Sequence, residues 1–442
     1  MTRPMTANRD SVSSDASPTR LAVGSWALYD LANTMFSMNI VSLFASLWVV
    51  NVMGGTDATW GFTMSISYAV IFVVSPFLGA LTDQAPKRMP FLVASTIVCV
   101  AFTALMGRGG LALSLVFFAI ANIAYQAGLQ FYDALLPDVS REDNRGRIGG
   151  LGVGLGYVGS FVGVAVATLI LGSGIDDLSV DQQHARYTTV FQVTAALFLL
   201  FALPCFLFVR ERRRQRTFSV ASVAAAARQV ASTVRASGRY PGLLRFLIGR
   251  VFYTDSVNTV IVFMGLYVTA EVGFDQAAVG PIMMVAIAFA VIGGFGWGAV
   301  VDRVGPKRTL DWVLFLWMAI FVWTAVVGMF DLPRLAFLPV PPLAGIALGG
   351  TWAADRPYML RLTPPARIGE FYGLYGMVGR FSAITGPFVW GFIVDILGWG
   401  RPAAIATLLA GVVIAYVILR KVSDEPRAWP PEERLDAQRE PA

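Results

Sequence analysis

The chain has 442 residues, of which 56% are hydrophobic and only 14% are charged, whereas an ordinary soluble domain carries about 25% charged residues. Lipid-facing helices need no polar shell, so this composition indicates a membrane protein and excludes a soluble domain of this size. The formal charge of +6 has to be assigned loop by loop, and it does not by itself indicate nucleic-acid binding.

Two cysteines and one histidine restrict the chemistry further. Cys99 and Cys205 both lie in apolar runs, which excludes a disulfide framework and a thiolate metal site, and His184 alone cannot form a histidine zinc site. No lysine is followed by serine or threonine, so the sequence has no phosphate-binding loop of the Walker type. We expect a protein that is not an enzyme and that holds no metal or cofactor.

In chain order, residues 1–24 are polar and lack the apolar core of a cleaved signal peptide, so we expect a disordered cytoplasmic tail. Twelve apolar runs follow, each near the roughly 20 residues that cross a bilayer. A linker at residues 210–245 divides the runs into two bundles at 25–209 and 246–419, and residues 420–442 form a second tail. The runs are placed at residues 25–50, 59–81, 89–107, 111–136, 148–171, 188–209, 246–269, 277–301, 309–329, 340–360, 370–394 and 402–419.

The basic residues predict the orientation. With both termini inside, the cytoplasmic segments hold 27 of the 34 Lys and Arg residues and the opposite side holds four, as the positive-inside rule requires. The linker opens with RERRRQR, which either binds anionic lipid headgroups or only fixes the topology. We expect a multi-pass protein of a bacterial inner membrane with cytoplasmic N and C termini.

A polar hairpin motif follows the second apolar run and occurs twice in the sequence. GALTDQAPKR at residues 79–88 returns as GAVVDRVGPKR at residues 298–308, with the first glycine 219 residues further on (298 − 79). The triplet RIG at residues 147–149 returns at residues 367–369, 220 residues further on (367 − 147). A repeat of about half the chain is implied, and gene duplication is its simplest explanation.

A third pair links the first and seventh runs. Asp30 and Asn33 return as Asp255 and Asn258, 225 residues further on (255 − 30). Because each half starts on the same side of the membrane, the halves are expected to be parallel repeats about an axis along the membrane normal. The prediction is that the halves superpose with Asp30 over Asp255, and that the two hairpins superpose likewise.

The paired hairpins resemble the loop signature of the major facilitator superfamily, and the twelve-span pattern extends the resemblance over essentially the whole chain. Within that superfamily, WALYDLANTMF (residues 26–36), FYDALLP (131–137) and YTDSVNT (253–259) look like the vacuolar effluxer family. The resemblance implies an all-α membrane protein of two six-helix repeats, and it implies export of an amino acid or related metabolite. Residue 86 is proline where the superfamily has glycine, and WAAD at residues 352–355 replaces a glutamine- and serine-containing stretch that faces the presumed cavity.

Polar and ionisable groups inside the spans are the candidate solute or coupling residues, because a charge in the bilayer is costly and normally faces a cavity or a partner. Asp30 and Asp255 are candidates for carrying a coupling proton, with dipole stabilisation near a helix start as the alternative. Arg380 lies mid-span, where its fork of donors suits a carboxylate. The full set is Asp30, Asn33, Gln126, Gln130, Asp133, Arg250, Asp255, Asn258, Trp352, Asp355, Arg356 and Arg380.

The repeated hairpins suggest a conformational latch. A helix start favours a carboxylate, so we expect Asp83 to cap the eleventh span and Asp302 the fifth, across the two halves, only while the cytoplasmic side is closed. The alternative is that both hairpins supply only tight turns and positive charge. The expected latch residues are Gly79, Asp83, Lys87, Arg88, Arg147, Gly298, Asp302, Lys307, Arg308 and Arg367.

These patterns predict a secondary active transporter that moves a small polar or amphipathic solute by alternating access, more in efflux than in uptake. A proton or sodium gradient would drive it, and its partners would be the solute and the lipid bilayer, with no nucleic acid and as a monomer. Two alternatives keep the same fold. One is an exporter of lipid-like or drug-like amphiphiles, and the other is a membrane sensor that does not transport.

Overall fold

The structure is a computed structural model that describes residues 19–84, 87–140, 145–211, 232, 235, 237–423, 425 and 429. Within these residues the chain is helical, with no strand. Eleven helices are long and apolar enough to cross a membrane, and Met89–Leu105 is a shorter apolar helix of 17 residues. The prediction of an all-α membrane protein with twelve spans is confirmed.

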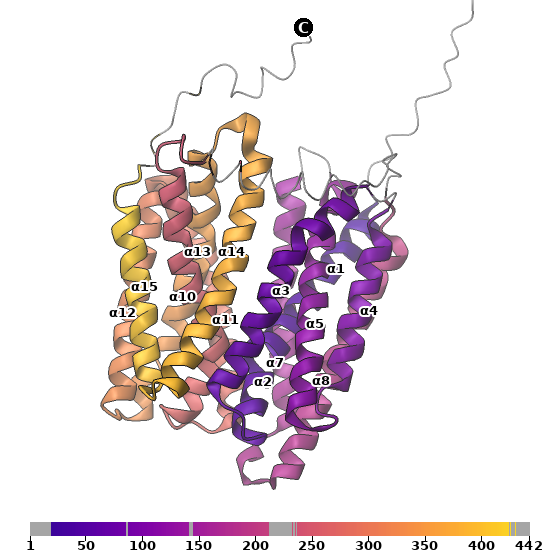
Figure 1. The fold of residues 1–442 in the computed structure, drawn as a ribbon, viewed down its shortest axis with the longest axis vertical. Coiled ribbons are helices and arrows are strands. Elements are labelled where there is room, and N and C mark those ends of the chain that lie inside the picture. Colours follow the sequence, from indigo (N-terminus) through magenta and orange to yellow (C-terminus); the bar gives the residue numbers. More distant parts are fainter. Residues whose placement is uncertain are drawn as a thin grey trace, which may run out of the picture.

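Helices before the linker form the first helix group, drawn in indigo to magenta in Figure 1. Helix α1 and its continuations η1, α2 and η2 make one long first span, Arg20–Val52. The elements are α1 (Arg20–Phe36), η1 (Ser37–Leu43), α2 (Phe44–Leu47), η2 (Trp48–Val52), α3 (Asp57–Gln84), α4 (Met89–Leu105), α5 (Gly110–Asp133), α6 (Leu136–Val139), α7 (Arg145–Leu171), η3 (Ile175–Asp177) and α8 (Val180–Phe208).

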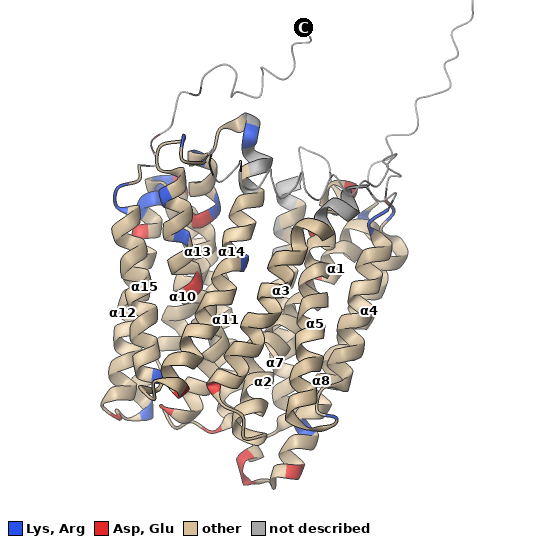
Figure 2. Ribbon diagram, in the orientation of Figure 1, with Lys and Arg blue, Asp and Glu red and all other residues tan. Residues whose placement is uncertain are grey.

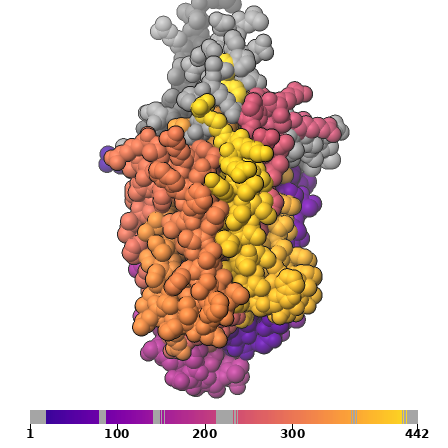
Figure 3. All heavy atoms as spheres, turned by 90° about the vertical axis from the view of Figure 1, so that its left-hand side faces the viewer, coloured from indigo at the N-terminus to yellow at the C-terminus, as the bar shows by residue number. Residues whose placement is uncertain are grey.

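Helices after the linker form the second helix group, and Figure 3 shows α12 and α15 side by side along its outer face. The elements are α10 (Leu243–Ala270), α11 (Gln276–Val304), α12 (Pro306–Met329), η4 (Arg334–Phe337), α13 (Val340–Leu362), η5 (Pro365–Arg367), α14 (Ile368–Gly391), η6 (Phe392–Ile396) and α15 (Gly400–Leu419). The two groups meet where α3 packs on α14 and α7 packs on α11.

Lys and Arg gather at one end of the helices, which we call the basic end, and the opposite end is called the acidic end (Figure 2). The second copy of the repeated hairpin turns at the basic end. There Gly305 adopts φ +91°, a conformation that favours glycine, and Pro306 starts α12 at a position where no backbone N–H donor is needed. The hairpin therefore breaks one long apolar run into two spans.

Close helix packing explains the glycine-rich start of the fifth span. A Cβ atom added to Gly159 of α7 would lie 2.2 Å from the carbonyl oxygen of Leu31 in α1, and one added to Gly163 would lie 2.6 Å from the side chain of Met35. Small residues let two backbones approach in this way. This face of α7 fixes where the first helix lies, and so positions the residues that line the centre of the molecule.

Candidate solute-binding site

A cavity of about 400 Å³ lies between the two helix groups. It is bounded by η1, α3 and α5 on one side and by α10 and α14 on the other. Among the described residues that line it, Arg380 alone is charged, and the uncharged polar ones offer hydroxyl and amide groups. These polar residues are Ser37, Ser42, Tyr68, Gln126 and Asn258.

Arg380 is held by a relay that crosses between the groups. Its guanidinium donates through Nη1 to Ser75 Oγ of α3. Ser75 Oγ in turn donates to Gln130 Oε1 over 2.7 Å, and Gln130 Nε2 donates to the Ser75 carbonyl oxygen over 3.1 Å. Ser75 is 4% exposed. The relay therefore holds one arm of the Arg380 guanidinium on the buried side of the residue, while Arg380 itself borders the cavity.

Gln126, Asn258 and Arg380 are the predicted residues that the structure brings together at the cavity, and Gln130 supports Arg380 from behind. Gln126 Nε2 donates to the hydroxyl of Tyr68 over 3.1 Å. Sequence reasoning missed Tyr68 and Ser75, which carry no charge. Hydroxyl groups on the apolar second span were the available signal.

The π-helical segment η1 was also missed. Ser37–Leu43 is π-helical and sets Ser37, Met38, Val41 and Ser42 against the cavity. Asn39 anchors it by donating to the carbonyl oxygen of Gly163 over 3.0 Å and to Thr194 Oγ1 over 3.1 Å. π-Helical turns recur at functional sites because they widen the helix and redirect side chains.

Arg250 and Asp355 bind each other away from the cavity lining. Arg250 Nε lies 3.0 Å from Asp355 Oδ2, with side-chain exposures of 5% and 0%. Tyr253 and Tyr375 both donate their hydroxyls to the same carboxylate, the latter over 2.5 Å, and the Arg250 guanidinium stacks 3.6 Å over the Tyr375 ring. The carboxylate oxygens are occupied from three sides, so this group joins α10, α13 and α14 and contributes nothing to the cavity wall.

Asp30 and Asp255 lie at different levels, which corrects the predicted superposition. Asp30 Oδ2 would be 3.3 Å from a Cβ atom at Gly152 of α7, whereas Asp255 Oδ1 would be 2.8 Å from one at Gly386 of α14. The 220-residue repeat equates Asp30 with residue 250, five residues before Asp255 (255 − 250), so the aspartates differ in level by more than one helical turn. The shared D-x-x-N-T letters therefore do not mark equivalent positions, because packing against glycines sets the helix register.

The surroundings of these residues also differ. Asp255 Oδ1 accepts a hydrogen bond of 2.7 Å from Thr385 Oγ1, and Asn33, 1% exposed, has no partner for either side-chain atom among the described residues. Neither aspartate lines the cavity. The remaining predicted residues do not line the cavity: Asp133 and Arg356 are exposed and Trp352 is half-buried. Asp133 lies near enough to Arg380 and Arg356 to interact with their charges.

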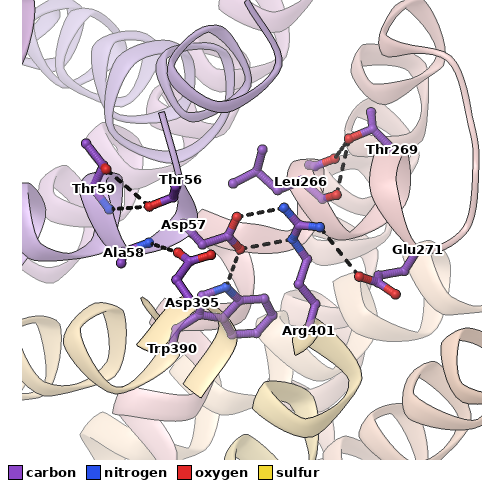
Figure 4. Close-up of polar contacts among 11 residues, drawn as sticks. Thr56, Asp57, Ala58, Thr59, Leu266, Thr269, Glu271, Trp390, Asp395 and Arg401 are labelled. Atoms are coloured by element: carbon purple, nitrogen blue, oxygen red, sulfur yellow. Dashed lines mark hydrogen bonds and ion pairs between the residues drawn. The ribbon is translucent and has the colours of Figure 1, made fainter. Parts of the chain in front are cut away.

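At the acidic end a buried ion pair joins the two groups (Figure 4). Asp57, the first residue of α3, accepts from Arg401 Nη2 over 2.7 Å and from Nε over 3.0 Å, and from Trp390 Nε1 over 2.8 Å. Asp395 Oδ2 accepts from the backbone N–H of Ala58 over 2.5 Å. We call Asp57, Trp390, Asp395 and Arg401 the acidic-end lock, and none of them was predicted from the sequence as a site residue.

The predicted latch residues at the basic end make their described contacts within their own helix group. Arg88 donates to the carbonyl oxygen of Ala134. Lys307 pairs with Asp311 over 2.5 Å, and Arg367 donates to the Tyr240 hydroxyl over 3.1 Å. Lys87, Arg308 and Asp302 are exposed, and Gly298 faces open space. The side chains of Asp83 and Arg147 and the surroundings of Gly79 lie outside the described part of the chain.

The latch stays a prediction, and its test is Asp302→Asn. A carboxylate against a partly buried helix start gains up to about 2 kcal/mol, so its loss should shift the protein toward the state open at the basic end by up to about thirtyfold. Cysteine pairs across each end, cross-linked in wild type and variant, measure the shift. Cross-linking ratios that do not change would leave the hairpin as a turn with positive charge.

Comparisons with known proteins agree with this fold. The family described as "Vacuole effluxer Atg22 like" matches residues 49–428. An uncharacterized MFS-type transporter, YxiO of Bacillus subtilis, is 26% identical over 91% of this chain and 94% of its own. Autophagy-related protein 22-1 of Neosartorya fischeri is 25% identical over 58% of this chain and 45% of that longer protein.

Solved structures agree in fold. The nucleoside transporter NupG superposes with a TM-score of 0.67 at 14% identity, over 91% of this chain and 98% of NupG. A bacterial homologue of the human lysosomal transporter Spinster superposes with a TM-score of 0.65 at 16% identity, over 93% of this chain and 98% of its own. These likenesses concern the arrangement of the helices alone.

Proposed function

The chain belongs to the Atg22-like vacuole effluxer family and is a membrane transporter of the major facilitator type, and on this premise we propose that it moves a small carboxylate-bearing solute by alternating access. The observation that carries the proposal is the cavity between the helix groups, where Arg380 is the one charged residue in the part of the lining that the structure describes. A guanidinium held in place by Ser75 presents a fork of donors that matches a carboxylate. An amino acid or related metabolite, moved outward, fits this chemistry.

The proposed orientation places the basic end in the cytoplasm, because Lys and Arg concentrate on the cytoplasmic side of membrane proteins. The acidic-end lock would then close the outer mouth of the cavity, and alternating access would consist of opening that lock while the basic end closes. The proposal includes a bacterial inner membrane as the location.

Counterflow tests the function. The purified protein in liposomes preloaded with leucine, glutamate, a dipeptide or a sugar should accumulate the matching labelled solute transiently, and only for solutes that carry a carboxylate. Protein-free liposomes are the control. Counterflow of the sugar and not of the carboxylates would overturn the proposed role of Arg380.

Asp255 is the proposed coupling residue, since a half-buried carboxylate hydrogen-bonded to Thr385 can take up and release a proton during the cycle. We expect Asp255→Asn to abolish accumulation driven by a proton gradient while counterflow continues, because exchange requires no net proton movement. Asp331→Asn, at an exposed position of the acidic end, is the matched control. Gradient-driven accumulation that survives in Asp255→Asn would remove Asp255 from this role.

A further inference from the structure

The central cavity borders a second hollow, and that hollow has an apolar wall. Met38 and Ile261 line both the cavity and a second hollow, a chamber of about 110 Å³ between α10, α11, α12 and α13. The chamber wall is apolar almost throughout, with Met264, Trp317 and Ile320 among its lining residues. Trp317 donates its Nε1–H to Thr351 over 2.9 Å, so the indole offers the chamber an apolar ring and no hydrogen bond.

The chamber in turn borders the outer surface of the bundle. Tyr157, Ile287 and Ala290 line both the chamber and a groove of about 460 Å³ between α7 and α11. The groove is walled by side chains that face outward, such as Phe161 at 44% and Phe295 at 80% exposure. On a membrane-spanning helix such side chains face lipid.

Cavity, chamber and groove are therefore neighbouring hollows that share wall residues, with Arg380 in the cavity and lipid-facing side chains around the groove. A wholly polar solute would gain nothing from the chamber wall, because burial of polar groups without partners is unfavourable. A hydrocarbon chain gains from every methylene that it places there. The geometry matches a molecule with one anionic end and one apolar chain.

We propose that the solute is a single-chain amphiphile whose carboxylate binds Arg380 and whose tail lies in the chamber and extends toward the groove between α7 and α11. This inference rests on the proposed function, because it takes the Arg380 cavity as the solute site. It narrows the solute class from small carboxylates in general to those with an apolar chain of several carbons. It also gives the bilayer a role as the source or the destination of the solute.

A homologous series of alkanoates tests the inference. Butanoate, hexanoate, octanoate and decanoate share one head and differ only in tail length, and their binding to the full chain in lipid nanodiscs is measured by calorimetry, with empty nanodiscs subtracted. Each methylene buried in the chamber should tighten binding about fourfold, as the transfer free energy of about 0.8 kcal/mol implies. From butanoate to octanoate the gain is then about two orders of magnitude.

Two variants locate the tail. Ala344→Phe adds a ring to a residue that lines the chamber, and it should remove most of the gain with chain length while butanoate binds as in wild type. Ala406→Phe adds the same ring to an exposed position of α15 and should leave the whole series unchanged. Arg380→Ala should weaken all four alkanoates by a similar factor, because it removes only the partner of the head.

The outcomes separate the two proposals. A rise with chain length that Ala344→Phe abolishes supports the amphiphile site. Binding that depends on Arg380 but is the same for all four alkanoates would overturn the tail site and leave the carboxylate site standing. A rise that Ala344→Phe does not alter would place the tail outside the chamber and contradict the inference. No binding by any alkanoate, together with no counterflow of any carboxylate, would overturn both.

Discussion

Replacing Arg380 with lysine should weaken the binding of a carboxylate solute almost as much as replacing it with alanine, by about ten- to a hundredfold. Hydrogen bonds to a charged group contribute about 1.5 to 3 kcal/mol, which gives this range. The guanidinium can bind Ser75 with one arm and a carboxylate with the others, whereas an ammonium is a compact charge without a planar fork. Calorimetry with leucine and octanoate as first probes measures the loss.

The control for this prediction is Arg303→Lys, which makes the same exchange at an exposed position of the basic end and should leave affinity unchanged. Ser75→Ala adds a graded step, because it keeps the charge of Arg380 but removes the group that orients it. We expect Ser75→Ala to lie between wild type and Arg380→Ala. Equal affinity in Arg380→Lys and wild type would show that the charge alone matters, and would count against bidentate recognition.

Much of the fold follows from the sequence because a bilayer imposes a length and an apolarity on every span. The eleventh span was expected at residues 370–394 and is formed by α14 and η6, which end at Ile396. Arg380 was singled out because a mid-span charge needs a cavity or a partner, and it lies on the cavity. In these cases one local property of the sequence is enough to predict the structural feature.

Pairings between distant segments could not be predicted in the same way. Asp57 and Arg401 lie at span ends, where charges are common, and nothing local indicates that they bind each other across 344 residues. Arg250 and Asp355 were correctly marked as costly in a membrane, but their mutual ion pair depends on how α10 packs beside α13 and α14. The level of Asp255 was misjudged for the same reason, since short repeated letters carry no information on helix register.

The acidic-end lock leads to the second large expected effect. Asp57 is 1% exposed and the Arg401 side chain 16% exposed, so Arg401→Ala would leave a buried carboxylate without its cation. Removing one partner of a buried ion pair costs about 3 to 5 kcal/mol. Because the pair joins α3 to α15 across the two helix groups, that cost falls on the state closed at the acidic end. The population should therefore shift toward the state open at that end by about a hundredfold or more.

Pulsed EPR distances between spin labels at Asn51 and Leu335, exposed positions at the acidic end of the two groups, measure the shift in a background without Cys99 and Cys205. Asp57→Asn should act in the same direction with a smaller shift, since the amide keeps the shape of the side chain but loses its charge. The matched control is Glu271→Gln, because Glu271 contacts the same Arg401 at the longer distance of 3.5 Å and its side chain is 23% exposed, against 1% for Asp57. Solvent therefore screens this pair more, and pairs near the surface contribute at most about 1 kcal/mol. If Arg401→Ala and Glu271→Gln gave the same distance distribution as wild type, the pair would hold the helix ends in place without controlling access to the cavity.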